Sequence, residues 1–130
     1  MILFDTDVCV EILRGNKKVI KRRQEYPWEV SISFITVAEL FYGAGNSDRP
    51  KENSVSVEKF IMTVGIIQSD LFILKRFGEI KSNLYQKNRL VADADIFIAA
   101  TALEKAETLV TGNIKHFDRI EGLKIENWIR

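Results

Sequence analysis

Short apolar runs alternate with longer helical patterns along the chain. Apolar runs at residues 1–4, 29–34, 64–68, 108–110 and 123–125 are too short for helices and predict strands. Between them, segments 8–14, 16–26, 36–42, 54–63, 70–88 and 96–103 have the composition or spacing of helices. Strands that alternate with helices favour a parallel sheet covered by helices on both faces. We therefore predict an α/β fold.

Glycine and proline mark the expected ends of these segments. Gly15 is expected to stop the first helix, and Pro27 closes the second. Gly43 and Gly45 are expected to end the helix over 36–42. The polar stretch 46–53, which carries Pro50, predicts a loop between helices rather than a domain boundary. One domain spanning residues 1–130 is the expectation.

Composition narrows the class of protein. The 130 residues are 46% hydrophobic, enough for a sizeable core. A net charge of +1 does not indicate a polyanion-binding or membrane-surface protein, so any nucleic-acid affinity must come from local clusters. One cysteine excludes an internal disulfide framework, and no apolar run reaches membrane-spanning length. The N-terminus lacks a signal-peptide pattern, which favours a cytoplasmic protein.

The stretch 91–113, VADADIFIAATALEKAETLVTGN, contains the most informative acidic residues. Asp93 and Asp95 stand directly before an apolar helical segment. The helix dipole favours a carboxylate in the first turn by ~0.3–1 kcal/mol, which suits an ionised metal ligand. Alternatively, one of the two aspartates is the N-cap of that helix. Both interpretations remain open at this point.

Acidic and amide side chains follow several predicted strands. Asp5 comes after the first strand, Glu39 lies one turn into the helix after the second, and Asn113 follows the fourth. Together with Asp95, these positions can converge at one edge of a parallel sheet. Carboxylates within ~4 Å of one another repel by ~4 kcal/mol per pair at an effective dielectric of about 20, so a cation is expected. Oxygen ligands without a His or Cys cluster point to Mg²⁺ or Mn²⁺.

Five segments, in order along nearly the whole chain, carry a family resemblance. They are Leu3–Val8 (LFDTDV), Ser33–Leu40 (SFITVAEL) with Gly43, Asp95–Ala100 (DIFIAA), Leu109–Asn113 (LVTGN) with His116 and Phe117, and Gly122–Trp128 (GLKIENW). This ordered set resembles the PIN-domain ribonucleases and, among them, the VapC toxins of toxin–antitoxin pairs. Each segment alone is a weak signal, and the ordered set is specific.

The resemblance implies a metal-dependent endoribonuclease, with tRNA a plausible substrate. It places Asp5, Glu39 and Asp95 as catalytic metal ligands for Mg²⁺ or Mn²⁺. Many family members carry Asp at the position of Asn113, so this chain departs from the fully acidic pattern. Side chains expected to orient water or the ligands are Thr6, Asp7, Asp93, Thr111 and Asn113. A homodimer and a VapB-like antitoxin that binds a helical groove and blocks the acidic pocket are also implied.

Basic residues cluster in the second helical segment. They are Lys17, Lys18, Lys21, Arg22 and Arg23, with Glu25 as the nearby acid. Such groups can contact RNA phosphates and give affinity without sequence information. A solvated helix face is the alternative explanation.

Several motifs have a purely structural explanation. Thr36 and Glu39 have the spacing of a capping box. The other expectations are an N-cap role for Asp70, a buried apolar role for Cys9, a structural role for His116 and an anchor for the chain end in Trp128. A cap role also remains open for Asp93 and a first-turn role for Asp7.

Two other function classes compete with the ribonuclease. A catalytically silent PIN module would act only through a partner. A phosphoacceptor signalling domain would use Asp5, Asp7 and Asp70 and leave Glu39 and Asp95 without a role.

Overall fold

A parallel sheet of five strands forms the centre of the computed structural model, which describes residues 1–130. The strands are β1 (Ile2–Phe4), β2 (Val30–Ser33), β3 (Gly65–Ile67), β4 (Thr108–Val110) and β5 (Ile125–Glu126). Their order in the sheet is β3-β2-β1-β4-β5, and every neighbouring pair is parallel. β1 therefore lies in the middle, with strands from distant parts of the chain on either side.

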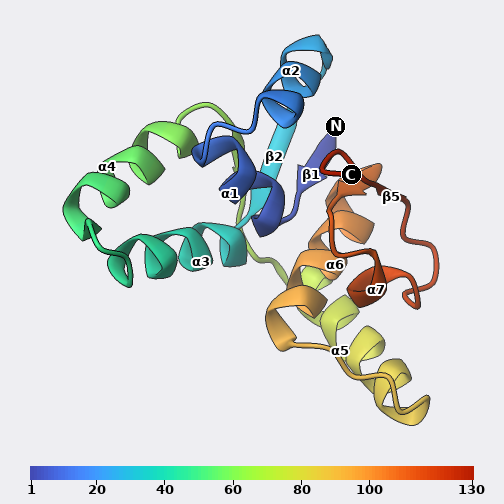
Figure 1. The fold of residues 1–130 in the computed structure, drawn as a ribbon. Coiled ribbons are helices and arrows are strands. Elements are labelled where there is room, and N and C mark those ends of the chain that lie inside the picture. Colours follow the sequence, from blue (N-terminus) through green and yellow to red (C-terminus); the bar gives the residue numbers. More distant parts are fainter.

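Helices cover both faces of this sheet (Figure 1). They are α1 (Thr6–Leu13), α2 (Lys17–Glu25), α3 (Phe34–Gly45), α4 (Pro50–Ile61), α5 (Leu71–Gln86), α6 (Asp93–Lys105) and α7 (Ile114–Phe117). α1 to α4 lie on one side of the molecule, and α5, α6 and α7 on the other. The predicted α/β fold is confirmed. No helix combines the length and the apolar composition that a membrane span requires.

Alternating side chains of the central strands divide the core in two. Ile2 and Phe4 of β1 belong to the apolar cluster under α1, α2 and α4, whereas Leu3 belongs to the cluster under α5 and α6. β4 alternates in the same way, with Val110 in the first cluster and Leu109 in the second. Each fully buried side chain of this size stabilises the fold by about 1.5–3 kcal/mol. The sheet is thereby fixed from both faces, and its carboxyl edge becomes a rigid platform.

The structure corrects several predicted boundaries. α3 continues through Gly43 to Gly45, because a helical glycine costs only about 1 kcal/mol and α3 packs along α4. α4 begins at Pro50, which the sequence placed in a loop; the first helical turn needs no N–H from that residue. The last strand lies at 125–126 rather than 123–125, since its pairing follows the buried residues of β4. The short helix α7 was not predicted.

Three structural expectations are confirmed. Asp70 caps α5, and its Oδ1 accepts a hydrogen bond from the backbone N–H of Ile73 at 2.9 Å. Cys9 is fully buried in the core. Trp128 is buried and packs edge-on against Phe4, with ring centroids 5.3 Å apart, so it anchors the end of the chain.

Candidate active site

The strand order creates a crevice where the carboxyl ends of β1 and β4 meet. The chain leaves β1 towards β2 and β3 and later returns to the opposite side of β1 as β4, which makes this the topological switch point. Asp5 follows β1 and Thr111 follows β4. The Thr111 hydroxyl donates to Asp5 Oδ2 at 2.7 Å, and both side chains are buried. Residues far apart in sequence are thus joined at the point where such folds place their ligands.

Asp5 is a carboxyl group that is costly to ionise. Its other oxygen, Oδ1, accepts from the backbone N–H of Thr6 at 2.8 Å. Burial raises the pKa of Asp5 to about 7, and the charge of Asp7 adds to this effect, while the hydrogen bond from Thr111 opposes it. Asp95 contributes a further, smaller repulsion to the raised pKa. A cation placed beside Asp5 would remove this cost.

Glu39 is held by α1 rather than by its own helix. α3 begins at Phe34 with Ser33 as its N-cap, so Thr36 lies inside the helix and cannot be the cap. The capping-box explanation of Glu39 is therefore wrong. Glu39 Oε1 instead accepts a hydrogen bond from the Thr6 hydroxyl at 2.7 Å. This contact places Glu39 at the entrance of α1, next to Asp5.

Asp95 lies in the first turn of α6 and is paired with a histidine. The N-cap of α6 is Ala92, without a side-chain cap bond, so the cap explanation fails for both Asp93 and Asp95. Asp95 Oδ2 lies 3.0 Å from His116 Nδ1 of α7. Burial raises the pKa of Asp95, and the charge and hydrogen bond of His116 oppose the shift. His116, expected to be structural, contacts one of the predicted ligands.

Asp7 lines the same pocket and joins α1 to the loop that follows β4. Its Oδ2 accepts from the backbone N–H of Gly112 at 2.8 Å, while its Oδ1 is buried without a partner. A Cβ at position 112 would lie 2.9 Å from Asp7 Oδ2 and 2.8 Å from Ile129 Cδ1, so the approach requires glycine. Burial raises the pKa of Asp7, and the Gly112 hydrogen bond opposes this. Both oxygens of Asp5 have donors, so Asp7 Oδ1 is the buried carboxylate oxygen of this pocket that lacks one.

One open pocket collects these side chains. It is lined by Asp5, Thr6, Asp7, Val10, Glu11, Arg14, Glu39, Asp95, Asn113 and His116. The oxygen donors match the preference of Mg²⁺ and Mn²⁺. No group of three His, Cys, Asp or Glu side chains is placed closely enough to hold a metal ion as the side chains lie. Each predicted ligand is held instead by a protein donor, namely Thr111, Thr6 or His116. The donor chemistry fits a hard divalent cation, and the spacing is wider than that of a formed metal centre.

Comparison with known proteins identifies the family of this chain. The PIN domain family model matches residues 2–123. Ribonuclease VapC2 from Haemophilus influenzae is 31% identical over 128 residues, which cover 98% of this chain and 97% of the relative. The chain belongs to the PIN-domain family of VapC ribonuclease toxins. The predicted resemblance is confirmed.

Two further relatives extend the match. The tRNA(fMet)-specific endonuclease VapC of Salmonella typhimurium is 32% identical over 127 residues, covering 97% of this chain and 96% of that protein. The crystal structure of VapBC2 from Rickettsia felis bound to a DNA fragment from their promoter aligns with a TM-score of 0.91 and 32% identity. That alignment covers 98% of this chain and 99% of the other. The shared fold of the VapC family thus extends over essentially the whole chain.

Not every predicted site residue lines the VapC pocket. Asp93 points away from it and pairs with Lys81 at 2.9 Å, with 58% of its side chain exposed. Thr111 lies beneath the pocket and acts on it only through Asp5 and the backbone N–H of Asn113, which donates to Thr111 Oγ1 at 2.9 Å. The structure therefore brings together Asp5, Thr6, Asp7, Glu39, Asp95 and Asn113 as pocket residues.

Four residues that line the pocket were not predicted as site residues: Val10, Glu11, Arg14 and His116. Glu11 and Arg14 follow Asp7 at helical spacing, so they lie on the same face of α1 and extend the pocket along it. That spacing was a usable signal. His116 was expected to be structural, because no partner at a recognisable spacing in the sequence supported a catalytic role.

The basic helix α2 does not reach the acidic pocket. Arg22 pairs with Glu126 and lies over the Trp128 ring, 5.2 Å from its centroid. Arg23 donates to the hydroxyl of Thr63 at 3.1 Å, and burial lowers its pKa. These two arginines hold α2 to the rest of the fold. Lys17, Lys18 and Lys21 are exposed, and their contact with RNA stays a prediction.

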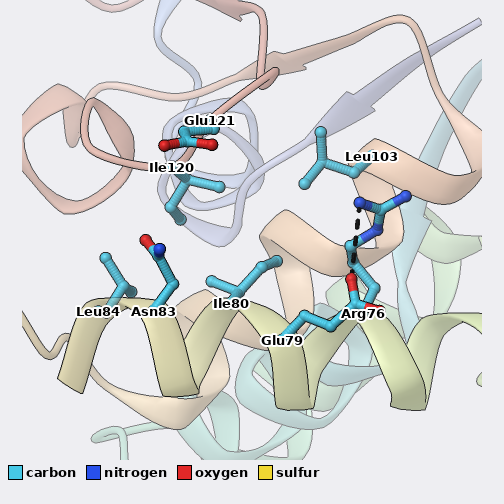
Figure 2. Close-up of a pocket in the computed structure, with 8 residues that line it drawn as sticks. All are labelled: Arg76, Glu79, Ile80, Asn83, Leu84, Leu103, Ile120 and Glu121. Atoms are coloured by element: carbon cyan, nitrogen blue, oxygen red, sulfur yellow. Dashed lines mark ion pairs between the residues drawn. The ribbon is translucent and has the colours of Figure 1, made fainter. Parts of the chain in front are cut away.

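A second hollow lies between α5 and the turn after α7 (Figure 2). Its cation, Arg76, is already paired with Glu104 at 2.7 Å and with Glu79 at 3.9 Å. Ile80 and Leu103 close the hollow with apolar surface. Because the charge of Arg76 is neutralised by these two carboxylates, this hollow lacks a free charged group of the kind that a catalytic site needs.

Proposed function

We propose that this chain hydrolyses phosphodiester bonds of RNA at the acidic pocket, with Mg²⁺ or Mn²⁺ held by Asp5, Glu39 and Asp95. The observation that carries the proposal is that carboxylates from three distant segments line one pocket at the switch point of the sheet. The raised pKa of Asp5, about 7, supports it, since such a group gains most from a neighbouring cation.

The protein residues prepare the carboxylates for this role. Thr111 and the backbone N–H of Thr6 fix both oxygens of Asp5. The Thr6 hydroxyl orients Glu39, and His116 orients Asp95. When bound, Mg²⁺ or Mn²⁺ lowers the pKa of a water molecule and offsets the charge of the scissile phosphate. Positioning residues of this kind typically contribute about 10–100-fold to metal affinity or activity.

Asn113 and Asp7 complete the donor set. Asn113 lines the pocket, and its side chain makes no cap bond to α7, so its amide oxygen is free to bind water or a ligand. Asp7 has one buried oxygen without a partner. We propose that these two side chains orient bound water. Many family members carry an aspartate at the position of Asn113. In this chain Asp7 would supply the negative charge that Asn113 lacks.

The proposed substrate is tRNA. Relatives from Salmonella typhimurium and Shigella flexneri, at 32% and 28% identity, are named tRNA(fMet)-specific endonucleases. The open, polar pocket suits an exposed strand of RNA better than a small molecule. Loops of tRNA present such strands.

An antitoxin is the proposed partner. An apolar groove between α1, α3 and α4 is lined by side chains that include Leu13, Leu40 and Val57. The groove shares Val10, Arg14 and Glu39 with the acidic pocket, so a segment bound there would reach the catalytic residues. The Rickettsia felis and Salmonella typhimurium structures are VapBC complexes. A VapB-like antitoxin in this groove would block the pocket.

A homodimer is proposed from an exposed apolar surface. Leu71 and Phe72 at the start of α5 are 67% and 66% exposed, and Ile66 lies on the edge strand β3. Exposed apolar side chains and an unpaired strand edge are each typical of an interface. Sedimentation of the free chain tests this, with a Leu71→Lys, Phe72→Lys variant expected to be monomeric.

Cleavage of an initiator tRNA transcript tests the main proposal. The chain should cut the transcript in Mn²⁺ or Mg²⁺ and leave it intact in EDTA. Intact transcript under every metal condition would favour the catalytically silent module. The phosphoacceptor alternative is disfavoured by the structure, because Asp70 caps α5 and pairs with Lys105 instead of joining Asp5 and Asp7.

A further inference from the structure

The acidic pocket adjoins a basic hollow that shares no lining residue with the apolar groove. This hollow is lined by residues from the end of α5, the connection from α5 to α6, helix α7 and the turn after α7. Its cations are Arg89, Lys115 and Arg119. His116 lines both the basic hollow and the acidic pocket, so the two surfaces are continuous. The acidic pocket is therefore continuous with two other surfaces, which we call the apolar exit (the groove between α1, α3 and α4) and the basic exit (the basic hollow).

The cations of the basic hollow are largely free of internal partners. Its carboxylate, Asp118, lies 4.0 Å from Arg119, and both side chains are about half exposed. Such an exposed contact contributes at most about 1 kcal/mol. Arg89 and Lys115 are exposed and take part in none of the ion pairs of this region. This differs from Arg22 and Arg76, whose charges are used within the fold.

The backbone around these cations is held in place. Asn88 adopts a positive φ of 54°, which turns the chain out of α5. The N–H of Arg89 then donates to Leu84 O at 2.8 Å, so the position of Arg89 is fixed although its side chain is exposed. Lys115 lies in α7, and Arg119 lies in the turn directly after it. Three cations from two segments are thus presented next to His116.

The four carboxylates of the acidic pocket, Asp5, Asp7, Glu39 and Asp95, repel RNA phosphates when they are ionised. Arg14 is the one arginine or lysine that lines the pocket with them, so further affinity for RNA must come from basic groups outside it. Arginine and lysine contacts to phosphate supply such affinity without reading sequence. The basic hollow is continuous with the pocket, whereas no residue of α2 lines the pocket.

We infer that Arg89, Lys115 and Arg119 form a phosphate-binding site for the RNA strand on one side of the cleaved bond. The strand leaves the acidic pocket across His116, and its next phosphates contact the three cations. The inference rests on the proposed ribonuclease function. It assigns the basic exit to the substrate and leaves the apolar exit to the antitoxin.

Binding of an initiator tRNA transcript in EDTA tests the site without cleavage. The variant Arg89→Gln, Lys115→Gln, Arg119→Gln should bind at least about 10-fold more weakly than the parent at 100 mM KCl. The slope of log K against log[KCl] should fall by about two to three, roughly one for each lost phosphate contact. In Mn²⁺, KM for tRNA should rise more than kcat falls. The matched control Lys51→Gln, Lys59→Gln, Lys75→Gln removes three exposed charges on α4 and α5 and should keep the parental slope.

The rival surface is tested by Lys17→Gln, Lys18→Gln, Lys21→Gln on α2. A larger loss of affinity and slope in this variant than in the Arg89 triple variant would overturn the inference. So would equal losses in the triple variant and the matched control, which would mean a general charge effect. A parent that fails to bind the transcript would overturn it as well. Because binding is measured in EDTA, a parent that binds but never cleaves contradicts the proposed function alone.

Neutral methylphosphonate linkages locate the site along the RNA. One such linkage placed next to the cleaved bond should weaken binding to the parent on one side of the bond only. The Arg89 triple variant should be insensitive to the same linkage, because its phosphate contacts are already lost. Equal sensitivity of parent and variant would place these cations away from the substrate. If the three cations bind an acidic segment of the antitoxin instead of RNA, the three substitutions should leave tRNA binding unchanged.

Discussion

The starts of α1 and α5 have the same local design and opposite electrostatics. Each helix follows a parallel strand and begins with an aspartate whose side chain accepts a backbone N–H, from Thr6 for Asp5 and from Ile73 for Asp70. Asp5 is 3% exposed, and burial raises its pKa to about 7. The hydrogen bond from Lys105 lowers the pKa of Asp70, which lies on the surface.

The position of the preceding strand explains the difference. β1 is central, so Asp5 has β2 and β4 on either side and receives neighbours from α3, α6 and the loop after β4. β3 is an edge strand, and the end of α6 supplies Lys105 to Asp70. A carboxylate after a parallel strand therefore becomes a candidate ligand through the topology around it, and not through its local sequence.

The largest expected effect is on RNA cleavage. Asp5→Asn should lower the rate of metal-dependent tRNA cleavage by about 100-fold or more, because a proposed ligand is lost. Glu39→Gln and Asp95→Asn should act similarly. Asp70→Asn should keep most of the activity, since asparagine also caps helices. Initial rates in Mn²⁺ decide this, and an inactive Asp70→Asn beside an active Asp95→Asn would show that the pocket is wrongly assigned.

The second effect is on stabilisation by metal. Mn²⁺ at about 100 times its Kd should raise the unfolding free energy of the parent by about 2.7 kcal/mol. Asp70→Asn should respond like the parent, whereas Asp5→Asn should respond much less. Denaturant unfolding in EDTA and in Mn²⁺ measures the difference. If Asp5→Asn gains as much from Mn²⁺ as the parent, Asp5 holds the fold and not the metal.

The third effect is on stability against pH without metal. Because the folded state raises the pKa of Asp5 from 3.8 to about 7, its protonated form stabilises the fold below pH 3.8, and this contribution is lost as the pH rises towards 7. At neutral pH in EDTA, Asp5→Asn should therefore be more stable than the parent by about 1–3 kcal/mol. Asp70 has a lowered pKa, so its contribution is present above pH 3.8 and is lost on acidification. Unfolding curves from about pH 2 to pH 8 for parent and variants test both signs; a less stable Asp5→Asn at neutral pH contradicts this account.

The carboxylates of the pocket were predictable, and their neighbours were less so. Strand ends and family motifs located Asp5, Glu39 and Asp95, because these signals survive in local sequence. His116 was expected to be structural, and its contact with Asp95 could not be predicted, since that contact depends on a four-residue helix placed by tertiary packing. Asp93 was predicted to orient water or the ligands, but it lies on another face of α6 than Asp95. In the first turn of α6, Asp93 pairs with Lys81, whereas Asp95 lines the pocket.

The boundaries of the helices and strands were likewise predictable where local sequence sets them and not where tertiary packing does. β1 and β4 were predicted almost residue for residue, because each is a buried apolar run. α3 was ended too early at Gly43, since local preference does not include the packing of α3 on α4. α2 was correctly predicted as a basic helix, but the sequence could not show that Arg22 is occupied by Glu126, 104 residues away.

The smallest expected effect concerns the hydrogen bond from a threonine hydroxyl that Asp5 has and Asp70 lacks. Thr111→Val keeps the shape of the side chain and removes the hydroxyl that donates to Asp5 Oδ2 at 2.7 Å and accepts from the N–H of Asn113 at 2.9 Å. Since this bond opposes the raised pKa of Asp5, its loss should move the pH dependence of stability in EDTA to higher pH. The fold should lose about 1 kcal/mol. Thr101→Val is the control, because its buried hydroxyl donates to Phe97 O at 2.7 Å and it does not line the acidic pocket. It should lower stability without moving the midpoint, and equal midpoints in parent and both variants would mean that Thr111 does not tune Asp5.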